Sequence, residues 1–276
     1  MDLKHVTVAG IPTLLRDDLP TPGSTAMFFP SDGEAGAQWL RYAAFDTPSA
    51  VIAGRAQAFV QEPHDIALGL LELLPRPTPT SSFILFGYSA GTVVACLAAL
   101  ALLEIEPAAP VRLILANPFA EWWPPTSWQH MPWAKPVLDQ VEADPGLRAR
   151  FEQRGDGHEI LRRAAAKGLR TAIILSGQNP ADRARATPIA EAARARIVTV
   201  PTDDHNLMHW LLPQMFARGR TEQGMVRLER RLAAQHRILT PEVPKATIEQ
   251  WARDQSQTMK AFWQTWPGLQ SLADHL

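Results

Sequence analysis

Between two apolar segments, residues 81–103 carry a Gly-x-Ser-x-Gly pentapeptide: SSFILFGYSAGTVVACLAALALL. The first apolar segment has the length of a buried strand, and the second has the length of a core helix. Glycines on either side of a serine predict a sharp turn that ends the strand at Phe86 and begins the helix near Ala90. A chain with this feature is expected to build a sheet whose strands alternate with covering helices.

Further apolar runs recur along the chain. Six are predicted as strands: residues 25–29, 50–53, 82–86, 111–116, 171–175 and 196–200. Helical patterns lie between them, at about 36–43, 64–74, 91–104, 158–167 and 188–194. The runs are continuous rather than alternating, as in a parallel sheet that is covered on both faces. The predicted fold class is therefore α/β, a mostly parallel central sheet flanked by helices, with an edge hairpin turning at Gly10.

The chain, with 276 residues, is long enough to bury one large core. Residues 1–218 are predicted to form that core domain, with an insertion at about 117–157 that breaks the alternation of strands and helices. Insertions of this length are typical of lids and binding loops. Four tryptophans in it are candidates either for lining a substrate pocket or for packing within the insertion: Trp122, Trp123, Trp128 and Trp133.

The last part of the chain, residues 219–276, follows the last predicted strand and its helix. Helical patterns at about 222–236 and 245–264 are separated by Pro241 and Pro244, which interrupt a continuous helix. We expect this helical C-terminal extension to pack on the core.

Charge and composition argue against several classes of function. A formal net charge of -1 gives no electrostatic footprint for nucleic acid or for an anionic membrane. The start, MDLKHVTVAG, lacks the apolar segment of a secretory signal, and the apolar residues 92–103 fit a buried helix better than a membrane span. The single cysteine, Cys96, can form no intrachain disulfide. A cytoplasmic protein with no metal and no cofactor is the expectation.

The strand-to-helix turn gives Ser89 a chemical role. A turn this sharp forces its central residue into a strained conformation that projects the side chain above the sheet. Gly87 and Gly91 are expected where a Cβ would collide with the packed strand and helix. The backbone N–H of Ala90, at a helix N-terminus, favours negative charge. Ser89 is therefore predicted to be a nucleophile beside one half of an oxyanion hole.

A nucleophilic serine needs a base, which follows it in the chain at the end of a later strand. The last predicted strand runs into the segment TDDHNLMHW. His205 occupies this loop and is the predicted base. His209, four residues on and within the next helix, is the second candidate.

The base needs an orienting acid, for which several candidates remain. Asp182 lies after the strand at 171–175, in the segment SGQNPADRARATP, and is the first candidate. Asp182 could instead cap the following helix. After the strand at 111–116, Asn117 and Glu121 occupy the other position used on this scaffold, and Asp203 is also open.

Four segments together resemble the α/β-hydrolase thioesterases of nonribosomal peptide and polyketide synthesis: FFPSDGEAGAQW, AVIAGRAQAF, FILFGYSAGTVVACLAALAL and VPTDDHNLM. The resemblance covers about residues 25–215 and is nearest to the stand-alone, type II members. It implies that a backbone N–H of Ser31 or Asp32 completes the oxyanion hole with Ala90. Gly33 and Glu34 stand where the family has a glycine pair.

The resemblance also implies a function. We expect a serine thioesterase that hydrolyses, transfers or cyclises acyl groups held as thioesters on CoA or on an acyl or peptidyl carrier protein, through an acyl-Ser89 intermediate. The insertion lies where this family carries its lid. Two alternatives are a general carboxylesterase or lipase-like hydrolase, and an acyl-binding protein with weakened catalysis.

Overall fold

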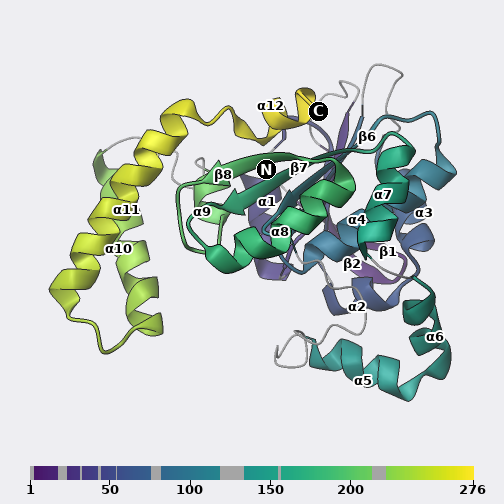
Figure 1. The fold of residues 1–276 in the computed structure, drawn as a ribbon, viewed down its shortest axis with the longest axis horizontal. Coiled ribbons are helices and arrows are strands. Elements are labelled where there is room, and N and C mark those ends of the chain that lie inside the picture. The colour runs from purple at the N-terminus through teal and green to yellow at the C-terminus, as the bar shows by residue number, and fades with distance from the viewer. Residues whose placement is uncertain are drawn as a thin grey trace.

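The computed structural model describes residues 3–17, 24–31, 33–42, 45–53, 55–75, 82–118, 134–154, 157–212 and 222–276. In these ranges the chain forms a sheet of eight strands: β1 (Lys4–Val8), β2 (Ile11–Arg16), β3 (Thr25–Phe29), β4 (Ser49–Ile52), β5 (Phe83–Tyr88), β6 (Val111–Ala116), β7 (Arg170–Ser176) and β8 (Arg196–Val200). Their order across the sheet is β1-β2-β4-β3-β5-β6-β7-β8 (Figure 1). The β1–β2 hairpin turns at Gly10, as predicted, and every neighbouring pair from β4 to β8 is parallel.

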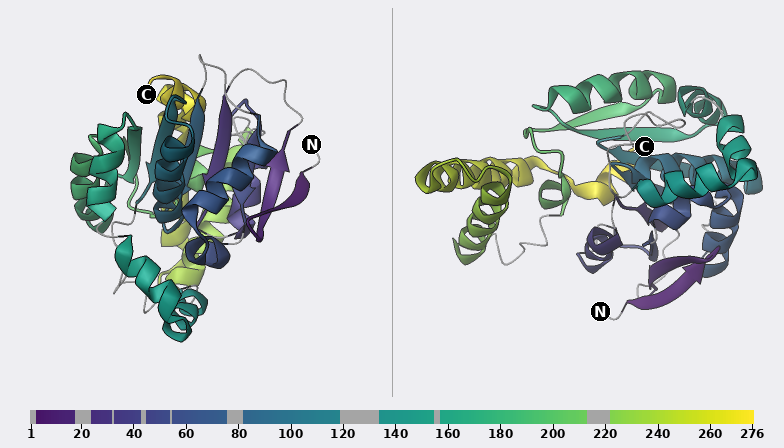
Figure 2. Two further views of the ribbon diagram at one scale, coloured as in Figure 1. Left: turned by 90° about the vertical axis from the view of Figure 1, so that its right-hand side faces the viewer. Right: turned by 90° about the horizontal axis from the view of Figure 1, so that it is seen from below.

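The described helices are α1 (Gly33–Arg41), α2 (Arg55–Val60), α3 (Pro63–Leu73), α4 (Gly91–Ile105), α5 (Lys135–Ala143), α6 (Pro145–Gln153), α7 (Gly157–Ala166), α8 (Pro180–Ala193), α9 (Met208–Leu211), α10 (Glu222–Leu239), α11 (Lys245–Thr265) and α12 (Gly268–Asp274). They cover both faces of the sheet (Figure 2). In β5, Phe83 and Leu85 join the core beneath α3 and α4, whereas Ile84 and Phe86 join the core beneath α1 and α9. Because successive strand residues face opposite sides, a strand covered on both faces must be apolar throughout.

This architecture confirms the predicted fold class. A mostly parallel sheet between two helical layers, with a serine at the sharp turn from β5 into α4, is the α/β-hydrolase fold. Three strands, at 25–29, 111–116 and 196–200, have the predicted bounds.

The prediction was incomplete, and it did not include helix α2. The helix expected at 188–194 begins at Pro180, because the Asn179 side chain accepts hydrogen bonds from the N–H groups of Ala181 and Asp182 and so caps a helix that continues through Pro188. The short helix α12 carried no clear periodic pattern and was not predicted.

The insertion contains two helices that were not predicted, α5 and α6. Asp144 caps α6 by accepting hydrogen bonds from the N–H groups of Gly146 and Leu147. Val137 of α5 and Phe151 of α6 join the core on the α4 side of the sheet. The four tryptophans predicted for a lid, Trp122, Trp123, Trp128 and Trp133, lie outside the described residues.

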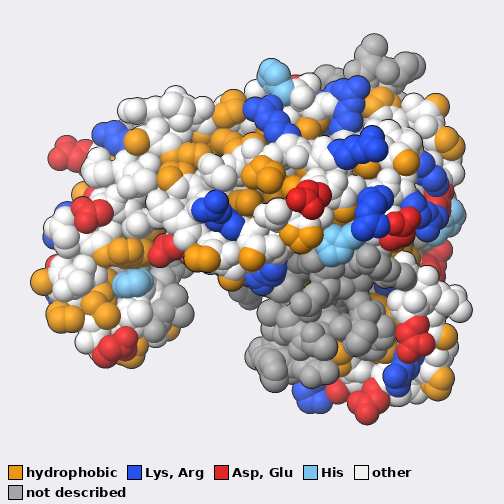
Figure 3. All heavy atoms as spheres, in the orientation of Figure 1, with side chains coloured by type: hydrophobic (Ala, Val, Ile, Leu, Met, Phe, Trp, Pro, Cys, Tyr) orange, Lys and Arg blue, Asp and Glu red, His pale blue; other side chains and the backbone are white. Residues whose placement is uncertain are grey.

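The C-terminal segment meets the body of the protein at two places. The α10–α11 hairpin projects from the body (Figures 1 and 3), and the Trp263 indole N–H at its base donates to the carbonyl of Trp210 in α9 at 2.9 Å. Beyond it, α12 returns to the sheet, where the Arg112 guanidinium donates to the carbonyl of Ala273 at 2.7 Å. Among the helices of the described ranges, none combines the length and the apolar character needed to cross a membrane.

Candidate active site

The turn between β5 and α4 holds Ser89 in a strained conformation. Its φ of 49° lies in the left-handed region that side chains other than glycine rarely adopt. A Cβ on Gly91 would lie 1.9 Å from the carbonyl oxygen of Phe29, and one on Gly87 would lie 2.7 Å from the Cα of Thr92. Both glycines are therefore required by close packing, as the sequence predicted, although β5 extends two residues further than expected, to Tyr88.

The same packing brings the end of β3 against the start of α4. Gly91 sits close to the carbonyl groups of Phe29 and Pro30, so the backbone leading to Ser31 runs beside the first turn of the helix. Ala90, with helical φ and ψ, is the residue that precedes α4. Its N–H is thus at a helix N-terminus next to the Ser89 side chain, where negative charge is favoured. Asp32, the other predicted oxyanion residue, lies outside the described residues.

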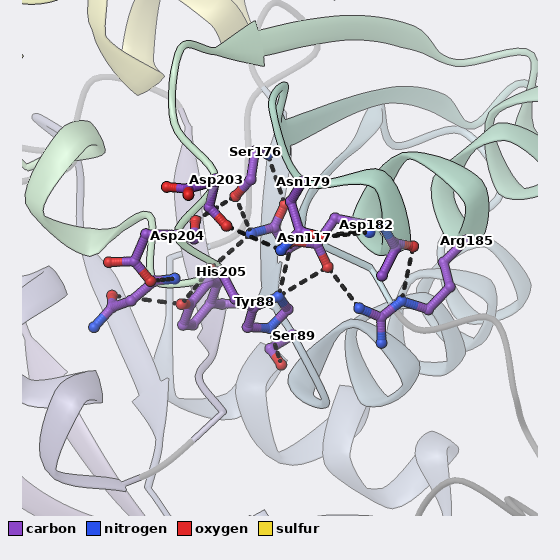
Figure 4. Close-up of polar contacts among 12 residues, drawn as sticks. Tyr88, Ser89, Asn117, Ser176, Asn179, Asp182, Arg185, Asp203, Asp204 and His205 are labelled. Atoms are coloured by element: carbon purple, nitrogen blue, oxygen red, sulfur yellow. Dashed lines mark hydrogen bonds and ion pairs between the residues drawn. The ribbon is translucent and has the colours of Figure 1, made fainter. Parts of the chain in front are cut away.

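Three predicted residues meet in one chain of hydrogen bonds (Figure 4). The Ser89 Oγ lies 2.9 Å from His205 Nε2, and His205 Nδ1 lies 3.0 and 3.1 Å from the two carboxylate oxygens of Asp182. With the imidazole proton on Nδ1, the ring donates to the carboxylate and accepts from the serine hydroxyl. The geometry and the chain order, serine, acid, histidine, are those of a Ser–His–Asp triad.

The start of α8 positions Asp182. It lies in the first turn of that helix, where the Asn179 cap fixes the backbone and the helix dipole favours a carboxylate. Its side chain is only 1% exposed, and the Arg185 guanidinium lies 2.6 Å from Oδ1. Asp182 therefore both contacts His205 and stabilises the start of α8, so the two interpretations drawn from the sequence are compatible.

Asn117, an alternative to Asp182 as the acid, instead binds the backbone of the loop that follows β8 and carries His205, here called the histidine loop. Its side-chain amide donates to the carbonyl of His205 at 2.7 Å and to the Ser176 hydroxyl at 2.8 Å, and its oxygen accepts from the Ser176 N–H at 2.9 Å. Asn117 is buried and has a φ of 43°. Asn117 thus contacts Ser176 and the backbone of the loop that carries His205.

Other side chains hold the same loop by its carbonyl groups. The Tyr88 hydroxyl donates to the carbonyl of His205 at 3.0 Å. The Ser176 hydroxyl donates to the carbonyl of Asp204 at 2.5 Å, and the Asn179 amide donates to that of Asp203 at 3.0 Å. These anchors come from the ends of β5 and β7 and from the cap of α8.

The remaining alternatives are placed differently. Asp203 contributes its backbone carbonyl to the loop and has an exposed side chain, and Glu121 lies outside the described residues. His209 is buried in α9, where burial and then the nearby Arg231 lower its pKa to about 4, opposed by a hydrogen bond with Gln235. The histidine that contacts Ser89 is His205.

Sequence reasoning missed three residues of this network, Tyr88, Ser176 and Arg185, and it considered Asn179 only as an alternative to Asp182, not as an anchor of the loop. Only the Gly-Tyr-Ser segment and the polar residues after each strand indicated that polar side chains would collect at this edge of the sheet. Which of them donate to the histidine loop depends on the register of β5, β6 and β7, because parallel strands bring their carboxyl ends together.

No protein-family model matches the sequence, and no curated protein matches it. Among solved structures, the chain is similar to a lipase-esterase related protein from Clostridium acetobutylicum, with 11% identity over 76% of this chain and 97% of the other and a TM-score of 0.49. A carboxylesterase of the thaumarchaeon Nitrososphaera gargenis has 11% identity over 79% and 96% of the two chains and a TM-score of 0.48. A thioesterase domain from the curacin biosynthetic pathway has 13% identity over 75% and 94%, with a TM-score of 0.46. Because these identities and TM-scores are low, the assignment of the α/β-hydrolase fold rests on the strand order of this chain and on its turn at Ser89.

Proposed function

We propose that this protein is a serine hydrolase that cleaves acyl thioesters through an acyl-Ser89 intermediate. The observation that carries the hydrolase proposal is the continuous chain of contacts from Ser89 Oγ through His205 to Asp182. A serine hydroxyl is a weak nucleophile until an adjacent base takes its proton, and the base needs a group that fixes its tautomer.

The chemistry then runs in two halves. Ser89 Oγ attacks the acyl carbonyl carbon while its proton passes to His205 Nε2, and the Ala90 N–H stabilises the oxyanion. Collapse of this intermediate breaks the bond to the leaving group, which takes the proton as a thiol. Water then attacks the acyl-enzyme, giving its proton to His205, and Ser89 leaves with a proton as the free acid is released.

The thioester as substrate is supported by the sequence segments at residues 28–39 and 50–59, which resemble those of thioesterases. On that basis the acyl group is carried on a pantetheine arm, of CoA or of an acyl or peptidyl carrier protein. A thiol leaving group has a pKa of about 8.5 and departs without much help from a general acid. The contact between Asp182 and His205 would also support departure of a poorer leaving group, so the triad by itself does not favour thioesters.

A general carboxylesterase is the second candidate, because the same contacts would support attack on an oxygen ester. Comparing kcat/KM for an acyl-pantetheine thioester with that for the oxygen ester of the same acyl group separates the two. A clear preference for the thioester is expected, and faster cleavage of the oxygen ester would contradict the thioesterase proposal while leaving the hydrolase proposal intact.

A hydrolase-like protein that only binds acyl groups is the third candidate, suggested by the uncertain acid in the sequence. The contact between Asp182 and His205 removes that reason. A phosphonofluoridate probe followed by intact-protein mass spectrometry tests it directly. We expect one adduct on the native chain and none on Ser89→Ala, and an unlabelled native chain would favour the binding protein.

A further inference from the structure

One carboxylate oxygen of Asp182 has two partners. Its Oδ1 lies 3.0 Å from His205 Nδ1 and 2.6 Å from an Arg185 guanidinium nitrogen. Figure 4 shows the two partners on opposite sides of the carboxylate. The guanidinium is steadied by a second hydrogen bond, from Arg185 Nε to the carbonyl of Ala181 at 3.2 Å, within the first turns of α8.

This contact differs from the other ion pairs between neighbouring turns of a helix. Arg162–Glu159 and Lys245–Glu249 join side chains that are 45% exposed or more, and such pairs contribute little because water screens them. The Asp182 side chain is 1% exposed and that of Arg185 is 37% exposed. A buried carboxylate is costly unless a counter-charge accompanies it.

The proton count explains why this counter-charge matters. His205 must be neutral at rest if its Nε2 is to accept a proton from Ser89, so it then offers Asp182 an N–H but no charge. Asp203 and Asp204 directly precede His205 in the loop and add negative charge, while the Tyr88 hydroxyl donates to the His205 carbonyl. Together with Asp182, these carboxylates surround with negative charge an imidazole that must be neutral to act as a base.

We propose that Arg185 is a positioning residue that keeps Asp182 ionised and oriented while His205 is neutral, and so keeps His205 Nε2 available to Ser89. The guanidinium carries a charge at every pH at which the protein is folded. It opposes the three neighbouring carboxylates at the imidazole and holds Oδ1 in line with Nδ1. This inference rests on the proposed hydrolase function.

The test compares Arg185→Gln and Arg185→Lys with a matched control, Arg183→Gln. Arg183 is exposed, lies in the same helix and has the same charge, whereas the Asp182 carboxylate contacts Arg185 and His205. The first readout is the pH profile of kcat/KM for a small acyl-pantetheine thioester. The second is the NMR titration of the His205 ring in the Ser89→Ala background, which requires no turnover.

In Arg185→Gln, the acidic limb of the profile and the ring titration should both move to higher pH by about 1 unit. At the acidic end of the profile, kcat/KM should fall about tenfold, and at alkaline pH the loss should be smaller. Arg185→Lys should restore the native midpoint, and Arg183→Gln should leave it unchanged. Arg185→Met, which keeps the apolar stem without the charge, provides the same comparison if the Gln variant does not fold.

Three results would overturn the inference. They are equal profiles for Arg185→Gln and Arg183→Gln, a loss of activity that is the same at every pH, and failure of Lys to restore the midpoint. None of these results contradicts the proposed function if the native chain still hydrolyses thioesters. Conversely, a native chain that is neither labelled nor active refutes the proposed function, and the ring titration still decides whether Arg185 biases His205.

Discussion

The Asn117 side chain donates hydrogen bonds to two acceptors at once, the carbonyl of His205 and the hydroxyl of Ser176. It thereby joins the end of β6 to the end of β7 and to the loop that carries the histidine. Asn117 adopts a positive φ to do so. A residue that the sequence suggested as an alternative acid is thus part of the support for the base.

Asn117→Asp should impair activity through geometry. A carboxylate has no N–H to give, so its oxygen would face the His205 carbonyl oxygen across 2.7 Å. We expect kcat to fall about 10- to 100-fold with little change in KM, and the free energy of unfolding to fall by about 2 kcal/mol. Steady-state kinetics and urea unfolding measure both, and an active, stable Asp variant would show that the loop is held without this contact.

Asp182→Asn should abolish most of the activity. The amide cannot hold the Nδ1–H tautomer of His205 as the carboxylate does, and kcat should fall by about 10³-fold or more. Asp203→Asn is the matched control, because the Asp203 side chain is exposed and only its carbonyl joins the loop. Equal losses in the two variants would contradict the assignment of Asp182.

Gly91→Ala should prevent normal folding. The added Cβ would lie 1.9 Å from the Phe29 carbonyl oxygen, which is backbone of β3 and cannot move aside cheaply. We expect a loss of more than about 3 kcal/mol of unfolding free energy or no folded protein. Gly168→Ala, where the Cβ meets nothing within 4 Å but φ is +94°, should cost only about 1 to 2 kcal/mol.

Stability should fall as the pH falls below about 6.5, in part because of His209. Its pKa is about 4 in the fold, against about 6.5 in the unfolded chain, so the unfolded state binds a proton that the folded state excludes. The contribution is complete above pH 6.5 and is lost between pH 6.5 and 4, in total on the order of 3 kcal/mol. His209→Gln should flatten this dependence in urea unfolding at pH 7 and pH 5, whereas His64→Gln, in the exposed part of α3, should not.

Trp263→Phe should loosen the α10–α11 hairpin from the body. The substitution keeps an aromatic ring but removes the N–H that donates to the Trp210 carbonyl. We expect the free energy of unfolding to fall by about 1 to 2 kcal/mol. Hydrogen exchange should become faster than in the native protein in α11, and should change less in β5. Unchanged exchange in α11 would show that the hairpin is held by its apolar contacts alone.

The sequence by itself determined the α/β alternation, the strained turn at Ser89 and its glycines, because continuous apolar runs and Gly-x-Ser-x-Gly have few physical alternatives. It also placed His205 and Asp182 among the candidates, since polar residues after parallel strands collect at one edge of the sheet. Thioester specificity, the carrier partner and the oxyanion role of Asp32 stay predictions.

Only the tertiary structure decided between Asp182 and Asn117. The two follow neighbouring strands, β7 and β6, and composition does not distinguish a residue that reaches the imidazole from one that reaches the loop carbonyl. The difference arises from the register of the strands and the start of α8, which Asn179 sets by capping at Pro180. The same folding brings Arg185, one turn later, onto the oxygen that His205 shares. The contacts of His205 with Asp182 and with Asn117 join residues far apart in the sequence, and no local pattern encodes them.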